Sequence, residues 1–454
     1  MDVTASPRLV PPAPPRPAGQ LSLLPFLRAV RTNAITMWPD AAYEQPILVG
    51  GMAGRTSILL NAPDAIHHVL VANPGNFRRT PASIRILRPL TGEGLLLSEG
   101  DTWKLQRRTV APALAPRVMP MLASHIARSA EATLDTLPAG RPVNLLAAMQ
   151  TMALDIAGRS MFSLDMRGHQ DTLRELMMTF AERHAHPHMM DMVLPPSVPT
   201  MRDIGRARFR KRWTRFVDLL IAKRLAEPPP GAPRDLLDLL RAARDPETGI
   251  GFTPAQLRDQ VATLLLAGHE TTAVTLFWAL ITLASVPAEQ DRIAAEAAPL
   301  DLSPEGAHAA MASLVRTKAV VNETLRLFPA AFTLARQVIH ADQAAGIALP
   351  RGALLLIAPW VLHRHRTLWA DPEVFDPDRF MPEAPTPPRF AFMPFGAGPR
   401  VCVGAQFALA EVVLTLAALL RRFQVERVDD RPVIPVGIVT TQPDHPAEVR
   451  LAPR

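Results

Sequence analysis

The stretch that most limits how this chain can fold is a very long apolar helix predicted over residues 254–286. Residues 253–256 are Thr-Pro-Ala-Gln, in which threonine caps the helix, proline occupies the first turn and glutamine completes a capping box. The helix ends before Pro287, so it spans about 50 Å at 1.5 Å per residue. Because its middle is apolar on nearly every side, it has to cross the core of a large domain.

The centre of this helix nevertheless carries the polar sequence Ala267-Gly268-His269-Glu270-Thr271-Thr272. A glycine and an acid inside a buried helix are unfavourable unless they are used. Thr271 can hydrogen-bond a carbonyl one turn back and bend the helix. Two interpretations follow: a satisfied buried acid at a kink, or a proton-delivery pair, Glu270 and Thr271, beside a reacting centre.

The only cysteine lies in a second unusual stretch, Phe395-Gly396-Ala397-Gly398-Pro399-Arg400-Val401-Cys402-Val403-Gly404. Its glycines permit positive φ and close backbone approach, so it is predicted to be a shaped loop wrapped around something. The apolar run 405–420 follows as a helix, and its N-terminus would favour the thiolate form of Cys402, which binds metals. The alternative is an inert buried cysteine.

Two further pairs of polar residues share helix faces. Trp103 and Arg107 are four residues apart, so they either hold an anionic group or are a packing tryptophan beside a solvated arginine. Glu323 and Arg326 are three apart and can pair. With Arg379 they would form a buried charged network that is structural rather than catalytic and costly to break.

The chain as a whole is predicted to be mainly α-helical with small β-sheets. Of its 454 residues 48% are hydrophobic, which is enough for a large core. Short strands are predicted at 45–49, 56–60, 353–357 and 436–441. No linker divides the chain, so we expect one domain over residues 21–454 after a disordered, proline-rich leader over residues 1–20. The segment from Phe77 to Gly94 is predicted as a loop whose apolar side chains either line a pocket or make ordinary core contacts.

The composition excludes several classes of function. The net charge is +7, but the basic residues are nearly all arginine, without the lysine-rich runs or aromatic interleaving of a nucleic-acid binder. A single cysteine rules out an internal disulfide or a multi-cysteine zinc site, and it fits a reducing cytosol. No segment has the roughly 20 uninterrupted apolar residues of a membrane span, and no signal peptide begins the chain. A soluble, cytoplasmic protein is expected.

These motifs, in this order, resemble those of the cytochrome P450 haem-thiolate family over about residues 20–450. The loop Phe395–Gly404 is similar to the haem-binding pattern, and Ala267–Thr271 to the oxygen-activation motif of the central helix. Glu323–Arg326 resembles the Glu-x-x-Arg motif, and Asp376–Phe380 the aromatic-arginine segment that follows it. Trp103 and Arg107 are similar to the family's haem-propionate contacts. The resemblance implies the P450 fold, in which a long central helix crosses over the haem.

The resemblance also implies a cofactor, haem b, whose iron is bound by the Cys402 thiolate. Trp103, Arg107, Arg336 and Arg400 would then hold the two propionates, because carboxylates in an apolar core need cationic partners. Phe395, Gly404 and Ala267 would lie beside the haem. Glu270 and Thr271 would organise the waters that protonate iron-bound dioxygen, which argues for chemistry driven by O2 and electrons.

The implied reaction is hydroxylation of a hydrophobic substrate. By position, the residues that resemble the family's substrate contacts are Leu90, Ala267, Ala331, Phe332, Val439 and Thr440. They are mostly small or apolar, which points to a fatty acyl or terpenoid compound without choosing between them. Alternatives are a haem-thiolate isomerase, dehydratase or peroxygenase, or a non-catalytic haem-based sensor, which would have no need of Glu270 and Thr271.

The central-helix motif and the segment from His363 to Trp369 resemble most those of soluble bacterial fatty-acid hydroxylases and their relatives. Few residues follow Cys402, so no fused reductase is expected. Electrons would come from NAD(P)H through a reductase and a ferredoxin or flavodoxin. An acidic partner of this kind would dock on a basic patch, for which the candidates are Arg108, Arg117, Arg421 and Arg422. The alternative for each of them is a scattered solubilising arginine. A monomer is expected.

Overall fold

The structure is a computed structural model that describes residues 9–454 except 53–54, 165, 167, 187, 189, 192–193 and 227–230. The described α-helices are α1 (Leu23–Thr32), α2 (Pro63–His67), α3 (Pro81–Thr91), α4 (Gly100–Val110), α5 (Met119–Leu134), α6 (Leu145–Phe162), α7 (Gln170–Arg183), α9 (Met201–Leu225), α10 (Leu236–Ala242), α11 (Pro254–Leu283), α12 (Pro287–Ala297), α13 (Ala307–Ala310), α14 (Val315–Leu327), α15 (Pro359–Leu362) and α16 (Ala405–Arg422). The described strands are β1 (Ile47–Met52), β2 (Arg55–Leu60), β3 (Phe77–Arg78), β4 (Pro142–Asn144), β5 (Leu334–Val338), β6 (Asp342–Ala344), β7 (Ile347–Leu349), β8 (Leu354–Ile357), β9 (Phe423–Arg427), β10 (Pro435–Gly437), β11 (Thr441–Pro443) and β12 (Glu448–Pro453). The prediction of a mainly α-helical protein with small sheets is confirmed.

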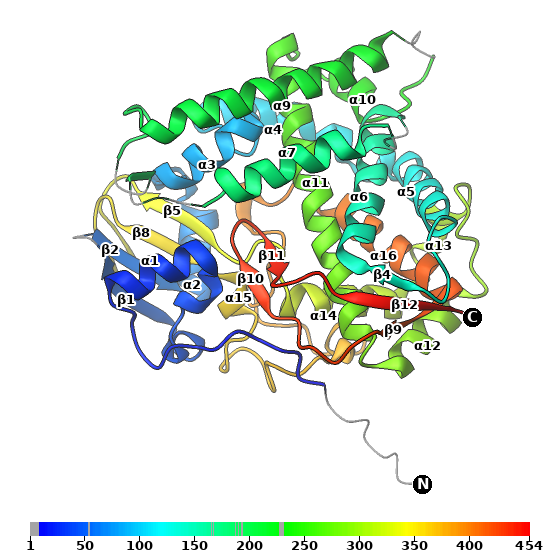
Figure 1. The fold of residues 1–454 in the computed structure, drawn as a ribbon. Helices are drawn as coiled ribbons and strands as arrows, with labels where there is room; N and C mark the ends of the chain where they lie inside the picture. The colour runs from blue at the N-terminus through cyan, green and yellow to red at the C-terminus, as the bar shows by residue number, and fades with distance from the viewer. Residues whose placement is uncertain are drawn as a thin grey trace.

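The largest sheet lies on the left of the helical body in Figure 1, and the sheet of β4, β9 and β12 lies at the lower right. The largest has the order β1-β2-β8-β5-β3, in which β2 and β8 run parallel and the other neighbours antiparallel. A three-stranded sheet, β4-β12-β9, holds the last strand of the chain between two others. The remaining described strands form two hairpins, β6-β7 and β10-β11. The second hairpin matters below because its turn reaches the core.

Helix α11 runs through the middle of the domain, as its sequence predicts (Figure 1). Its capping box is present: Gln256 N donates to Thr253 Oγ1, and Thr253 N donates to Gln256 Oε1. It contacts α3, α6, α9, α14 and α16. In the part of the chain that the structure describes, it is also the only helix long and apolar enough to span a membrane, and most of its apolar window is buried inside the domain. This is the pattern of a core helix.

The segment 77–94 is not the loop that the sequence suggests. Most of it is helix α3, which begins at Pro81 with the Thr80 side chain accepting a hydrogen bond from Ser83 N. Gly92 ends the helix with φ +58°, a conformation that favours glycine. The helix was not predicted because its capping residues, Thr80 and Gly92, are of types that also form turns.

The prediction of a single strand over residues 436–441 is also wrong. The chain makes a hairpin there, with β10 and β11 joined by a turn over residues 438–440. The turn is placed by its surroundings: a Cβ at Gly437 would lie 2.8 Å from Ile35 and 3.1 Å from the Phe332 ring. Asn33 bonds the same strand twice, donating to Pro435 O and accepting from Gly437 N.

The described part of the predicted leader, residues 9–20, lies along the domain. Phe375 N donates to Leu9 O, and Asp40 N donates to Pro17 O. The Arg16 guanidinium lies 3.7 Å from the centre of the Tyr43 ring and forms an ion pair with Glu373. These contacts do not fit a disordered leader over residues 9–20, and the reason is that arginine and backbone groups in the proline-rich stretch find partners on the folded domain.

Candidate functional site

A cavity of about 460 Å³ lies between α11 and the loop that contains Cys402. From α11, the cavity is lined by residues 263–268 and by Glu270, Thr271, Thr272 and Thr275. From the loop, it is lined by Phe395, Cys402 and Gly404 among others. The two polar motifs that the sequence separates by more than a hundred residues therefore face one space.

The cysteine loop is shaped by glycine, as predicted. Gly396 and Gly398 have φ values of +74° and +72°. A Cβ at Gly398 would lie 1.9 Å from the carbonyl oxygen of Leu70, so no other residue fits there without a shift of the backbone. Cys402 N donates to Phe395 O at 2.9 Å, which closes the loop directly before α16.

The Cys402 side chain is exposed to the cavity but surrounded by protein. Burial raises the pKa of its thiol, while the Gly404 amide and the Arg107 guanidinium act in the opposite direction. Burial and the two neighbouring groups therefore act in opposite directions on the thiolate form that the sequence suggests. A bound metal cation would supply the missing charge, because a coordinating thiol is deprotonated.

The cavity is lined by several arginines that have few acidic partners. Arg79, Arg107, Arg336 and Arg400 all line it. Burial lowers the pKa of each guanidinium, that of Arg79 to about 9. Among the described residues, the carboxylate that contacts this group is Glu99, which forms an ion pair with Arg400 and accepts from Arg79 N. Such an excess of buried positive charge fits a ligand that carries carboxylates.

Arg79 was missed in the sequence, where it follows Arg78 just before the cap of α3 and carries no motif of its own. Its Nε is buried and hydrogen-bonds none of the described residues. The predicted partners are nearby: Arg107 donates to Val401 O at 2.8 Å, and the Arg400 guanidinium lies 4.5 Å from the centre of the Trp103 ring. Arg336 and Arg400 act electrostatically on Arg79, so these three guanidinium groups lie close together at the cavity, which Trp103 and Arg107 also line.

On α11, the backbone is open to the cavity. A Cβ built at Gly268 would have no atom within 4 Å, and the same holds for Gly404 below. Thr271 Oγ1 donates to Ala267 O at 2.6 Å, the contact one turn back that the sequence predicts. Open space beside Gly268 and Gly404, a free thiol and several arginines fit an iron-bearing dicarboxylate such as haem.

The family comparison agrees with this geometry: the family model described as Cytochrome P450 matches residues 14–449. The chain belongs to the cytochrome P450 family. It is 32% identical to cyclooctatin synthase of Streptomyces melanosporofaciens over 77% of this chain and 76% of that protein. It is 29% identical to cyclooctat-9-en-7-ol 5-monooxygenase of the same organism, over 81% and 79%. The putative cytochrome P450 135B1 of Mycobacterium tuberculosis is 32% identical over 81% and 76%.

This P450 is a haem-dependent oxidoreductase. The side-chain partners of Glu270 are both neutral. Glu270 Oε1 accepts from Gln442 Nε2 at 2.7 Å and from Thr440 Oγ1 at 3.1 Å, and both donors are neutral. Burial raises the pKa of Glu270, and the two hydrogen bonds oppose that rise only in part. Gln442 was missed in the sequence because it lies far along the chain in no recognisable motif.

The predicted substrate contacts divide into two groups. Leu90, Ala267, Ala331, Val439 and Thr440 line the cavity described above. Phe332 does not: its ring is buried against Gly437 and lines a neighbouring cavity of about 330 Å³ instead. Phe332 was assigned by its position next to Ala331, and the fold places these two neighbouring side chains in different cavities.

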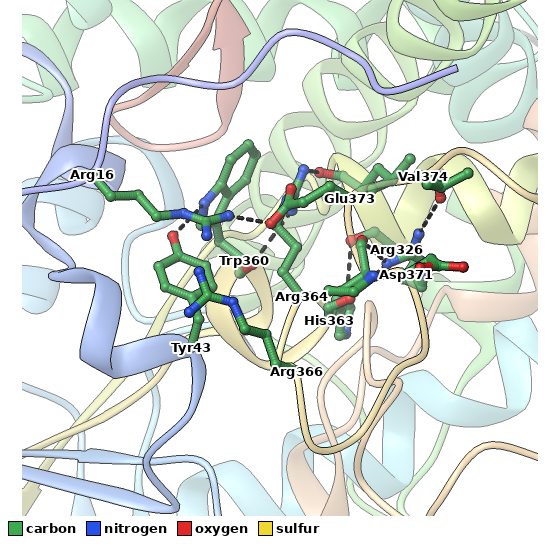
Figure 2. Close-up of polar contacts among 12 residues, drawn as sticks. Arg16, Tyr43, Arg326, Trp360, His363, Arg364, Arg366, Asp371, Glu373 and Val374 are labelled. Atoms are coloured by element: carbon green, nitrogen blue, oxygen red, sulfur yellow. Dashed lines mark hydrogen bonds and ion pairs between the residues drawn. The ribbon is translucent and has the colours of Figure 1, made fainter. Parts of the chain in front are cut away.

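The predicted charged network is assembled around Arg326, and none of its three members lines the cavity. Figure 2 shows Arg326 beside His363 and Val374. Arg326 donates to both oxygens of Glu323 at 2.7 Å, and to the carbonyls of His363 and Val374. Arg379 Nε lies 3.7 Å from Glu323 Oε1. Arg326 and Glu323 are fully buried. This arrangement ties α14 to the segment that leads toward the cysteine loop.

The four arginines predicted as a docking patch are mostly engaged within the chain. Arg108 forms a bidentate pair with Asp245, at 2.7 and 3.0 Å, and Arg422 forms a pair with Asp135. Arg421 donates to Leu300 O, and Arg117 is exposed. Internal acids neutralise much of the charge that an acidic partner would meet.

Proposed function

We propose that this P450 is a monooxygenase that hydroxylates a bulky hydrophobic compound, with a terpenoid as the first candidate and a fatty acyl compound as the second. The cavity above Cys402 carries this proposal, since its substrate side is formed by small and apolar residues such as Leu90, Ala331 and Val439. The bacterial relatives that modify terpenoids support the choice of class.

Haem b bound through Cys402 would supply the activation of O2 and the transfer of one oxygen atom to the substrate. Arg79, Arg107, Arg336 and Arg400 would hold its carboxylates, with Trp103 beneath Arg400. Phe395 and the bare backbones of Gly404 and Gly268 would leave room for its plane. The apolar walls would exclude bulk water and hold the substrate.

Glu270 and Thr271 are proposed to supply protons. Burial keeps the pKa of Glu270 above its usual range, so its carboxyl can hold a proton closer to neutral pH than an exposed glutamate. Thr271 Oγ1 already gives its hydrogen to Ala267 O, and its lone pairs remain as acceptors toward the cavity. The pair favours a monooxygenase over a peroxygenase or a sensor.

Electrons are proposed to come from NAD(P)H through a reductase and a small acidic carrier, a ferredoxin or a flavodoxin. The exposed Arg117 and the partly engaged Arg421 and Arg422 are the candidates for its docking site. We also propose a soluble, cytoplasmic monomer, with residues 21–454 as the catalytic domain.

The test begins with the reduced carbon monoxide difference spectrum, which should show the long-wavelength Soret band of thiolate ligation and lose it in Cys402→Ala. Terpenoids and fatty acids are then compared for the spin-state shift that follows displacement of water from haem iron. Glu270→Gln and Thr271→Ala should each consume NAD(P)H and O2 while forming much less product. A wild-type spectrum without that band, or full coupling in both variants, would contradict the proposal.

A further inference from the structure

We propose that Gln442 is a positioning residue for Glu270: together with Thr440 it ties one carboxyl oxygen to the C-terminal hairpin and leaves the other oxygen facing the cavity. The inference rests on the proposed role of Glu270 in proton delivery. It concerns a residue outside the recognised motifs, on β11, about 170 positions along the chain from the acid it would hold.

The three side chains form a closed set of hydrogen bonds with consistent donors. Gln442 Nε2 lies 2.7 Å from Glu270 Oε1 and 2.8 Å from Thr440 Oγ1, so each amide hydrogen has an acceptor. Thr440 accepts one of them and donates its own hydroxyl hydrogen to Glu270 Oε1 at 3.1 Å. Both donors thus reach Oε1, and no hydrogen bond from a described residue reaches Oε2.

The hairpin is held firmly enough to act as a support. Between Thr440 and Gln442, Thr441 is buried and fixed at three points: its N donates to Ala330 O, its Oγ1 to Pro329 O, and its carbonyl accepts from Trp278 Nε1 on α11. The same helix therefore carries both Glu270 and an anchor of the hairpin. A carboxyl with only one side chain partner could rotate, whereas two donors on an anchored strand define its orientation.

The hairpin also connects the acid to the substrate. Val439 and Thr440 line the cavity, but Gln442 does not. A substrate that contacts the turn could displace Thr440 and Gln442, the two donors of Glu270. The position of the Glu270 carboxyl would then depend on how the substrate fits the cavity. Gln442 separates the two effects, because its substitution alters the support of Glu270 without removing a cavity-lining side chain.

Few other charges act on Glu270. The ionisable groups that face the same cavity are Glu411 from α16, Cys402 and the arginines at 79, 107, 336 and 400. His269, next in the chain, is buried toward α6, where Gln150 is its partner, and its pKa is lowered by burial to about 4, so it is neutral. The Glu270 carboxyl itself has two neutral donors as its side-chain partners.

The experiment compares two variants with opposite expected effects. Gln442→Met keeps the length of the side chain and removes both donors, so the pKa of Glu270 should rise further, because hydrogen bonds to a carboxylate favour its ionised form. Gln442→Lys restores a donor and adds a cation, so the pKa should fall. Gln424→Met, on a half-buried position of β9, is the matched control for the methionine side chain.

Two readouts are measured on the holoenzyme. Infrared difference titration follows the protonated-carboxyl band that Glu270→Gln abolishes; its midpoint should move up in Gln442→Met, down in Gln442→Lys and not at all in Gln424→Met. The pH dependence of product formed per NAD(P)H should move the same way, and coupling at neutral pH should fall about three- to tenfold in Gln442→Met, part of the roughly 10²–10⁴-fold that a placed acid contributes. The KM for substrate should stay unchanged.

The outcomes separate this inference from the proposed function. If Glu270→Gln uncouples the enzyme but the infrared midpoint is the same in Gln442→Met, Gln442→Lys and wild type, the positioning role is wrong and the monooxygenase stands. Equal losses in both Gln442 variants with no opposite shifts would assign Gln442 a purely structural role and overturn the inference. Opposite shifts of the carboxyl band support it on evidence that does not depend on turnover.

Discussion

Two glutamates in this P450 are both enclosed by protein, yet their surroundings differ completely. Glu323, on α14, is bonded by both arms of the Arg326 guanidinium and by Asp376 N, with Arg379 at 3.7 Å. Glu270, on α11, has two neutral donors and faces a cavity. Burial raises the pKa of both carboxyls, but in Glu323 cationic partners act against the rise.

The difference separates an acid that is held in an ion pair from one that is proposed to deliver protons. Bidentate arginine partners favour the ionised form of a buried carboxylate, and the pair links segments of chain, as the contacts of Arg326 with His363 and Val374 do. A buried carboxyl with neutral donors and a free oxygen is able to gain and lose a proton. The residue type is the same in both cases, and the partners decide the role.

The largest expected effect is the loss of Arg326. Arg326→Leu leaves the buried Glu323 carboxylate without its main partner, which should destabilise the fold by about 3–5 kcal/mol and reduce the yield of folded haem protein. The measurement is guanidinium unfolding monitored by circular dichroism. The double variant Glu323→Leu, Arg326→Leu should be less destabilised than Arg326→Leu alone. If Arg326→Leu is as stable as wild type, Glu323 does not depend on Arg326 and the contrast with Glu270 is wrong.

A second buried carboxyl sharpens the comparison through pH. Glu411, on α16, accepts from Thr272 Oγ1 at 2.8 Å, while its Oε1 has no partner among the described residues, and burial raises its pKa to about 8. The folded state therefore binds this proton more tightly than the unfolded chain does. The resulting stabilisation is fully present below about pH 4.5, declines as the pH rises and is absent above about pH 8.

Glu411→Gln should flatten this decline, because the amide carries no titratable proton. The measurement is the free energy of unfolding at several pH values between 5 and 9 in wild type and variant, where one group contributes at most about 1.4 kcal/mol per pH unit. Glu305→Gln, at an exposed position, should leave the pH dependence as it is. Parallel curves for wild type and Glu411→Gln would show that the acid is ionised throughout this range.

The smallest expected effect lies at a second, partly exposed set of charges, formed by Arg16, Arg364 and Glu373. Figure 2 shows Arg16 and Arg364 both directed at Glu373, with Arg16 beside Tyr43. Arg16 and Glu373 remain partly exposed, so Arg16→Ala should lower the free energy of unfolding by only about 1 kcal/mol or less. Arg16→Lys should keep part of the effect. Thermal unfolding measures both, and a loss as large as that of Arg326 would mean that the N-terminal segment belongs to the core.

Much of the site was readable from the sequence because its parts are local. The capping box of α11, the glycine loop around Cys402 and the spacing of Glu323 and Arg326 are each set within a few residues. The errors have an equally physical origin. Helix α3 was taken for a loop because its caps are turn residues. The hairpin was taken for one strand because its turn depends on contacts with Ile35 and Phe332. Residues 9–20 were taken for a leader because their partners lie on distant segments.

The sequence by itself determined that a long apolar helix with a polar centre and a glycine-shaped cysteine loop must share one core, since neither can be stable in water alone. Only the tertiary structure decided what partners the polar groups receive. Arg79 lines the cavity with the other arginines. Gln442 and Thr440 contact Glu270, and Thr272 contacts Glu411. Each of these three contacts joins residues that lie at least 139 positions apart in the chain. Spacing along a helix determines which side chains share a face, but the packing of other elements against that face determines whether an acid there is paired, neutral or free to exchange a proton.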